Sequence, residues 1–109
     1  MKEKQIYFLI ELCNKYSCLS AFKARFDNNY SQFGKMFSPT TNYVEISSYG
    51  PISIENDLEA IIINPFVITG HSKYVKPKTI DNTEGILNEL NVAQIHYTQN
   101  EEGFILIVW

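Results

Sequence analysis

Apolar residues near the start of the chain recur at the spacing of a helix. Between Ile6 and Cys13 they fall at positions i, i+3, i+4 and i+7. A second apolar row continues on another face as far as Phe26. The pattern predicts a helical region from Glu3 to about Phe26, wrapped by other elements because two of its faces are apolar. The serines near residues 16–20 leave open a break that would begin a second helix.

Alternation of apolar and polar side chains predicts a strand over Asn42–Tyr49. Successive side chains of a strand point to opposite faces, so Tyr43, Glu45 and Tyr49 would share one face. The apolar side chains between them would then face the core. The Gly-Pro pair at residues 50–51 would end this strand.

The neighbouring segments give weaker patterns. Aromatic residues at helical spacing predict a short helical turn over 30–37, and the Ser-Pro-Thr-Thr run at 38–41 predicts a loop. Residues 52–64 fit a short helix entered after a serine, although the three consecutive isoleucines at 61–63 equally favour a strand. We favour the helix, followed by a strand over 66–69.

The last third of the chain has clearer signals. Asp81 with Glu84 three residues later predicts a capped helix that runs to Leu90. Residues 92–98 alternate like a strand, and a polar turn that ends in glycine separates them from the apolar run 104–109. These two strands would form a β-hairpin whose second strand is central in the sheet. We therefore predict an α+β protein with a single small domain over residues 1–109, in which an N-terminal helical region packs on a mostly antiparallel sheet that ends in a C-terminal β-hairpin.

Composition narrows the functional classes. The chain has 109 residues and a net charge of −3, and only 19% of its residues are charged, against about 25% in typical proteins. A basic footprint for nucleic acid is absent, and so is an apolar run that could export the chain or cross a membrane. We therefore expect a cytoplasmic protein that binds neither nucleic acid nor membrane. Cys13 and Cys18 lack the spacing of a metal or redox motif, and we expect buried, reduced thiols, no metal and no cofactor.

No strong catalytic motif occurs in the sequence. The best enzymatic candidate is His71-Ser72-Lys73, which offers a base, a hydroxyl and an ammonium after a predicted strand. A solvated polar turn explains these residues better, because loops are usually polar and exposed. His96 would lie on a strand, exposed or hydrogen-bonded. We therefore predict no catalytic residue and no enzymatic activity.

Acidic residues are segregated along the chain. Residues 37–70 and 79–109 carry carboxylates but neither Lys nor Arg, so they could together form an anionic face that attracts a cationic protein. The alternative is an ordinary solvated surface on which opposite charges cancel in space. The predicted partner-binding residues are Tyr43, Glu45, Tyr49, Glu55, Asp57 and Glu59.

Small size, acidity and the lack of catalytic motifs are properties of bacterial immunity proteins, which neutralise a toxin by binding it. The function we expect is therefore a small intracellular inhibitor that binds a protein partner such as a cationic toxin domain. Two alternatives remain: a small enzyme with a loop site at His71, Ser72 and Lys73, and a homo-oligomeric accessory module. The sequence leaves the oligomeric state open.

Overall fold

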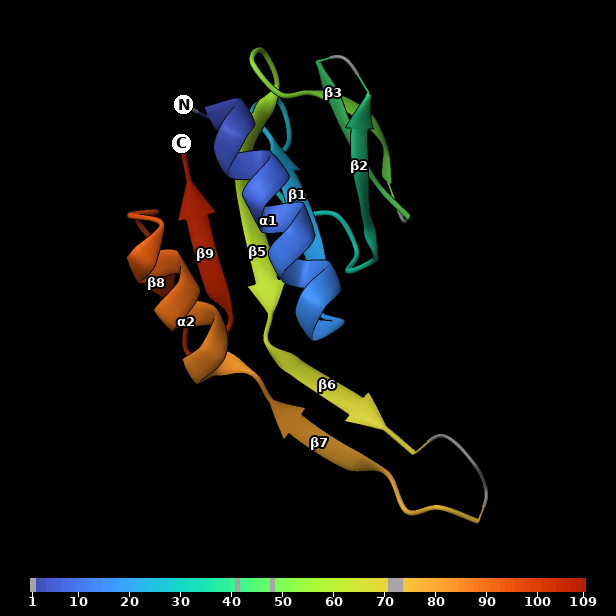
Figure 1. Cartoon of the computed structure of the whole chain (residues 1–109). Helices are drawn as coiled ribbons and strands as arrows, with labels where there is room; N and C mark the ends of the chain where they lie inside the picture. Colours follow the sequence, from blue (N-terminus) through green and yellow to red (C-terminus); the bar gives the residue numbers. More distant parts are fainter. Residues whose placement is uncertain (1, 41, 48, 71–73) are drawn as a thin grey trace.

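A computed structural model describes residues 2–40, 42–47, 49–70 and 74–109 of the protein. Over these residues the chain folds into two α-helices and several antiparallel strands (Figure 1). The elements are, in order, α1 (Lys2–Tyr16), β1 (Leu19–Ala24), β2 (Met36–Thr40), β3 (Tyr43–Ile46), β4 (Tyr49–Ser53), β5 (Leu58–Asn64), β6 (Phe66–Thr69), β7 (Lys78–Asp81), α2 (Thr83–Val92), β8 (Thr98–Gln99) and β9 (Ile105–Val108). The predicted α+β class, with an N-terminal helix and a C-terminal hairpin, is confirmed.

The strands form three antiparallel groups. A four-stranded sheet has the order β1-β5-β9-β8, a three-stranded sheet has the order β2-β3-β4, and β6 pairs with β7 alone. Helix α1 lies across the four-stranded sheet (Figure 1). Helix α2 lies on one side of α1, and the three-stranded sheet lies on the other side of α1. The β6–β7 pair extends away from the rest of the molecule.

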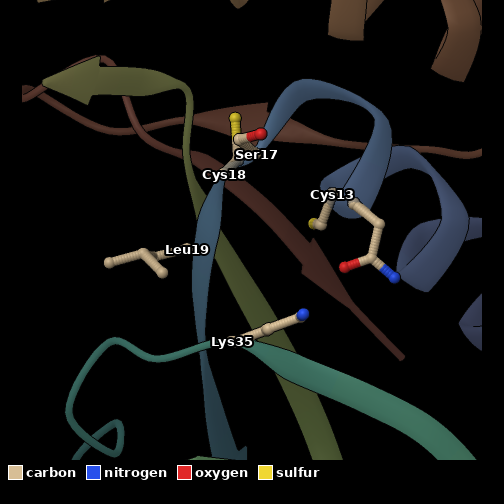
Figure 2. A pocket seen from close by; sticks show the side chains of 6 residues that line it. Cys13, Ser17, Cys18, Leu19 and Lys35 are labelled. Carbon is tan, nitrogen blue, oxygen red and sulfur yellow. The ribbon is translucent and has the colours of Figure 1, made fainter. Parts of the chain in front are cut away.

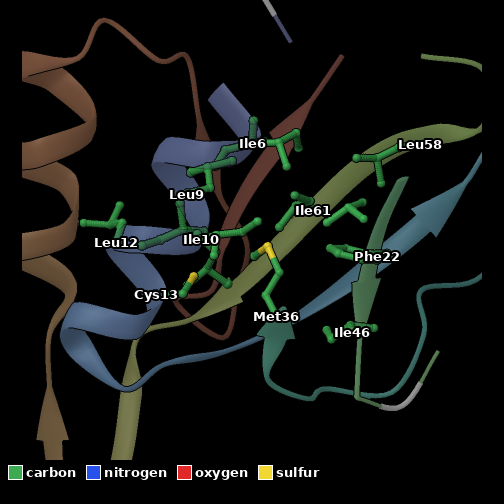
Figure 3. Close-up of a cluster of buried hydrophobic side chains, with 14 of the residues drawn as sticks. Ile6, Leu9, Ile10, Leu12, Cys13, Phe22, Met36, Ile46, Leu58 and Ile61 are labelled. Atoms are coloured by element: carbon green, nitrogen blue, oxygen red, sulfur yellow. The ribbon is translucent and has the colours of Figure 1, made fainter. Parts of the chain in front are cut away.

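One core joins α1 to both larger sheets. Ile6, Leu9 and Ile10 of α1 point toward Ile61 of β5 and Met36 of β2 (Figure 3). All five side chains are almost fully buried. At about 1.5–3 kcal/mol for each buried side chain of this size, this contact is a main source of the stability of the fold.

Helix α1 ends ten residues earlier than the sequence pattern predicts. The amide of Cys18 donates to the carbonyl of Cys13 (2.9 Å) and the amide of Ser17 to that of Asn14 (3.3 Å). These bonds make a Schellman motif, which stops a helix at a residue in the left-handed conformation. Here that residue is Ser17, with φ of 56°. The prediction of a helix to about Phe26 is therefore wrong for its second half, which is strand β1.

The middle of the chain is also more extended than predicted. Residues 30–37 form no helical turn, and residues 38–40, predicted as a loop, belong to β2. The predicted strand 42–49 is divided, because β3 ends at Ile46 and a new strand starts at Tyr49. The Gly-Pro pair lies inside that new strand. Residues 58–64 form β5 and not a helix, since they pair with β1 on one side and β9 on the other.

The C-terminal region keeps its helix and hairpin but not the long first strand. Helix α2 extends to Val92, and a second Schellman motif follows, with the amide of Ile95 donating to the carbonyl of Leu90 (3.0 Å). Gln94 takes the left-handed conformation, with φ of 59°. The predicted strand 92–98 is thereby reduced to β8, whereas β9 lies between β5 and β8 as a central strand should. In the part of the chain that the structure describes, no helix is long and apolar enough to span a membrane.

Candidate functional site

The outer side of the three-stranded sheet carries two of the predicted binding residues. Tyr43 and Glu45 are exposed on β3, whereas the alternate residues Val44 and Ile46 are buried against the core. Phe37 of β2 pairs directly with Glu45 and therefore lies on the same side. Tyr43 is 52% exposed and Phe37 is 42% exposed. We call this surface, made of Phe37, Tyr43 and Glu45, the β3 face.

The structure changes the place of Tyr49. Because β3 ends at Ile46, Tyr49 belongs to β4 and is the register partner of Ile46. The prediction that Tyr43, Glu45 and Tyr49 share a face of one strand is therefore wrong. The side chain of Tyr49 lies outside the part of the structure that is described.

The turn between β4 and β5 holds two of the remaining predicted acidic residues, Glu55 and Asp57, and the third, Glu59, lies at the start of β5. The first residue of the turn, Ile54, donates its amide to the carbonyl of Asn42 (2.9 Å), and Ser53 pairs with Tyr43. The turn that carries Glu55 and Asp57 therefore begins beside Tyr43, at the end of the molecule where β3 starts (Figure 1).

Basic residues from the start of the chain lie against this turn. Lys23 of β1 forms an ion pair with Glu59, and the backbone of Arg25 donates to the carbonyl of Asp57 (2.7 Å). Burial lowers the pKa of Lys2, Arg25 lowers it further, and the carboxylate of Glu55 opposes both. The charge segregation seen along the sequence is therefore not kept in space at this end, where carboxylates and cations alternate.

Sequence reasoning missed Phe37 because it placed this residue in a helical turn. No local signal in the sequence could have found it, because Met36 and Phe37 are both apolar and show no alternation. The structure identifies the strand by its partner, since Met36 pairs with Ile46 and is buried, while Phe37 pairs with Glu45 and is exposed.

A pocket of about 280 Å³ lies where α1 ends, lined in part by Cys13, Ser17, Cys18 and Lys35 (Figure 2). Both cysteines are free and buried, as predicted. Burial, with a smaller contribution from Cys18, raises the pKa of Cys13 to about 12. Burial also raises the pKa of Cys18, although a hydrogen bond from Asn82 opposes the shift. The thiolate is the nucleophilic form of cysteine, so neither thiol is prepared for chemistry near neutral pH.

The other chemical candidates gain no support. His71, Ser72 and Lys73 lie outside the described residues. His96 is exposed, but it follows α2 in an irregular segment and not in the predicted strand. Among residues 2–40, 42–47, 49–70 and 74–109, no group of three or more His, Cys, Asp or Glu side chains could hold a metal ion.

The β3 face is thus the predicted site that the structure assembles most fully. It offers two aromatic side chains and a carboxylate on a sheet whose other side is buried, an arrangement suited to binding another molecule. No protein-family model matches the chain, and neither a curated protein nor a solved structure matches it.

Proposed function

We propose that this protein is an inhibitor of the bacterial immunity type, which binds a cationic toxin domain through the β3 face. The observation that carries the proposal is the exposure of Tyr43 and Phe37 beside Glu45 on one sheet surface. Aromatic residues dominate the energetic centres of protein interfaces, where neighbouring charges select and steer the partner.

The support beneath the β3 face favours a preformed binding surface. Met36, Val44 and Ile46 alternate with the exposed residues and are at most 1% exposed. Their packing fixes the strands, so the aromatic side chains lose little freedom when a partner binds. More of the free energy gained from contact with the partner therefore appears as binding affinity.

The proposed partner is cationic because Glu45 is the charged member of the β3 face and the whole chain carries a net charge of −3. A basic toxin domain would be attracted over a distance of about one Debye length, and faster association would follow at low salt. Glu55 and Asp57 would lie at the rim of such an interface, where the cations beside them reduce their contribution.

Affinity capture from the native cell tests this function. Three baits are compared: the wild type, the variant Tyr43→Ala/Glu45→Lys, and the matched control Tyr7→Ala/Glu11→Lys, which removes an exposed tyrosine and reverses an exposed glutamate on α1. We expect a basic protein to be retained by the wild type and the control and lost by the β3-face variant. Equal retention by all three baits, or capture of an acidic protein, would contradict the proposal.

A further inference from the structure

The β6–β7 pair forms a projecting arm that the proposed function does not use. The arm (residues 66–70 and 74–81) extends from the body in Figure 1, and its strands chiefly contact each other. A two-stranded ribbon is only marginally stable in water by itself. Nevertheless Tyr74 is 86% exposed and Val75 is 52% exposed near its far end, and every residue of β7 is exposed. Exposed apolar residues on a projecting ribbon indicate an interaction surface.

The base of the arm is held firmly to the body. The amide of Asn82 donates to the carbonyl of Pro65 (3.0 Å), and its side-chain amide donates to the carbonyl of Tyr16 (3.2 Å). The ring of Phe66 lies 6.5 Å from that of Phe104. The arm therefore leaves the body in a defined direction, as a docking element needs to do.

An apolar groove lies beside this base. It has a volume of about 350 Å³ and is lined by the apolar residues Leu19, Phe66, Val67 and Ile68 together with Ser17 and Asn64. Leu19 is exposed although it is a large apolar residue at the edge of the four-stranded sheet. The groove is thus an apolar surface of a size that one or two side chains from another chain could fill.

Charge differs in sign between the far end of the arm and its base. Residues 66–80 contain three lysines and no carboxylate, whereas the rest of the chain has six basic and twelve acidic residues. At the base, Asp81 pairs with Phe66. The turn that carries Glu101 and Glu102 reaches the same ring, because a Cβ on Gly103 would lie 3.3 Å from it. Carboxylates therefore lie beside Phe66, one of the residues that line the groove, while Lys76 and Lys78 follow the exposed Tyr74 and Val75 along the arm.

We propose that the arm docks onto a second copy of this chain. In a two-fold dimer every contact occurs twice, so one surface must hold both halves of a complementary pair. The arm meets this condition: Tyr74 and Val75 fit the apolar groove, and Lys76 and Lys78 fit the carboxylates beside it. Each arm would insert Tyr74 and Val75 into the groove at the base of the other. This dimer is independent of the β3 face and of the function proposed for it.

Sedimentation velocity of the full chain at low and high salt tests the dimer. We expect the wild type to dimerise with a dissociation constant that rises with salt. Lys76→Glu/Lys78→Glu should raise that constant at least about 100-fold, because like charges would face each other. Lys4→Glu/Lys35→Glu is the matched control, since it changes the net charge equally at exposed lysines of the body. It should leave dimers intact. Circular dichroism melts verify that both variants fold.

A charge swap identifies the docking partner as the base of the arm. The variant Glu101→Lys/Glu102→Lys should also be monomeric alone, because its own lysines would meet the lysines of the partner arm. Mixed with Lys76→Glu/Lys78→Glu, it should form dimers again, since both halves of the mixed interface are then complementary. A wild type that stays monomeric at about 1 mM, where even weak association is detected, overturns the proposal. Loss of dimers in the control, or a mixture that stays monomeric, overturns it as well.

Discussion

Replacing Ser17 with glycine should stabilise the protein. Ser17 follows α1 with φ of 56°, a conformation in which the Cβ atom approaches the following carbonyl. The backbone needs this conformation, because it lets the amide of Cys18 reach the carbonyl of Cys13 and close the helix (2.9 Å). Glycine adopts the same conformation without the steric penalty.

The size of the effect follows from two opposing terms. The left-handed conformation costs a residue with a Cβ about 1–2 kcal/mol. Glycine loses more chain entropy on folding, which removes about 0.5–1 kcal/mol of this gain. With the middle of each range, Ser17→Gly should raise the free energy of unfolding by about 0.75 kcal/mol, which corresponds to an increase in Tm of about 3–5 °C for a chain of this length.

Calorimetry and urea denaturation of Ser17→Gly and Ser17→Ala measure this effect. Alanine is the control because it removes the hydroxyl but keeps the Cβ, so Ser17→Ala should show no comparable gain. Gln94, which ends α2 with φ of 59°, offers a second site where glycine should give a similar increase. The two gains should add to within about 0.5 kcal/mol, since the residues end different helices. A Ser17→Gly variant no more stable than Ser17→Ala would refute this account of the helix end.

Three further predictions concern the core. Ile107→Ala should lower the free energy of unfolding by about 2–5 kcal/mol, and Val108→Ala should lower it by no more than about 0.5 kcal/mol. The reason is that the side chain of Ile107 is 1% exposed and that of Val108 is 63% exposed. Similar urea midpoints for both variants would contradict the placement of β9. Ser20→Ala should stabilise the fold by up to about 1 kcal/mol, since within the described chain the buried hydroxyl of Ser20 has no hydrogen-bond partner. Ser53→Ala should destabilise the fold, because the hydroxyl of Ser53 accepts a hydrogen bond from the backbone amide of Asn56 (3.3 Å). The pKa of Cys13 is raised from 9.0 to about 12 in the folded state, so the stabilisation from the neutral thiol is complete below about pH 9 and is lost as the pH rises toward 12. In denaturation measured against pH, Cys13→Ala should therefore lose less stability over this interval than the wild type. An unchanged slope of the free energy of unfolding against pH would count against the burial of the thiol.

The elements that the sequence predicts correctly are those with strict alternation or clear turn residues. Val44 and Ile46 alternate with exposed residues as expected, and Gly103, with φ of 82°, ends the turn before β9. The strand at 66–69 is confirmed as β6. In β3 the pattern reflects a strand with one buried side, which a period of two describes well.

The missed helix ends share one physical cause. A glycine usually marks the end of a helix, but Ser17 and Gln94 take that position here, so neither helix end is visible in the sequence. Strand β1 then reads as more helix, because Ala21 and Phe22 are both buried and a strand buried on both faces shows no alternation.

The candidate site was predictable only where it depended on local order. The exposure of Tyr43 and Glu45 follows from their alternation within β3. The ion pair of Lys23 with Glu59 joins residues 36 positions apart, through the pairing of β1 with β5, and no local pattern indicates it. Phe37 likewise joins the β3 face only through its pairing with Glu45.

Growth rescue tests the proposed inhibition most directly. The captured partner is expressed in a host cell with the wild type, with Tyr43→Ala/Glu45→Lys, or with the control Tyr7→Ala/Glu11→Lys. If the β3 face binds and neutralises a toxin, expression of the partner alone arrests growth, the wild type and the control restore growth, and the β3-face variant fails to restore it although it folds and accumulates equally. Equal rescue by all three proteins, or a partner that is harmless when expressed alone, would contradict the account.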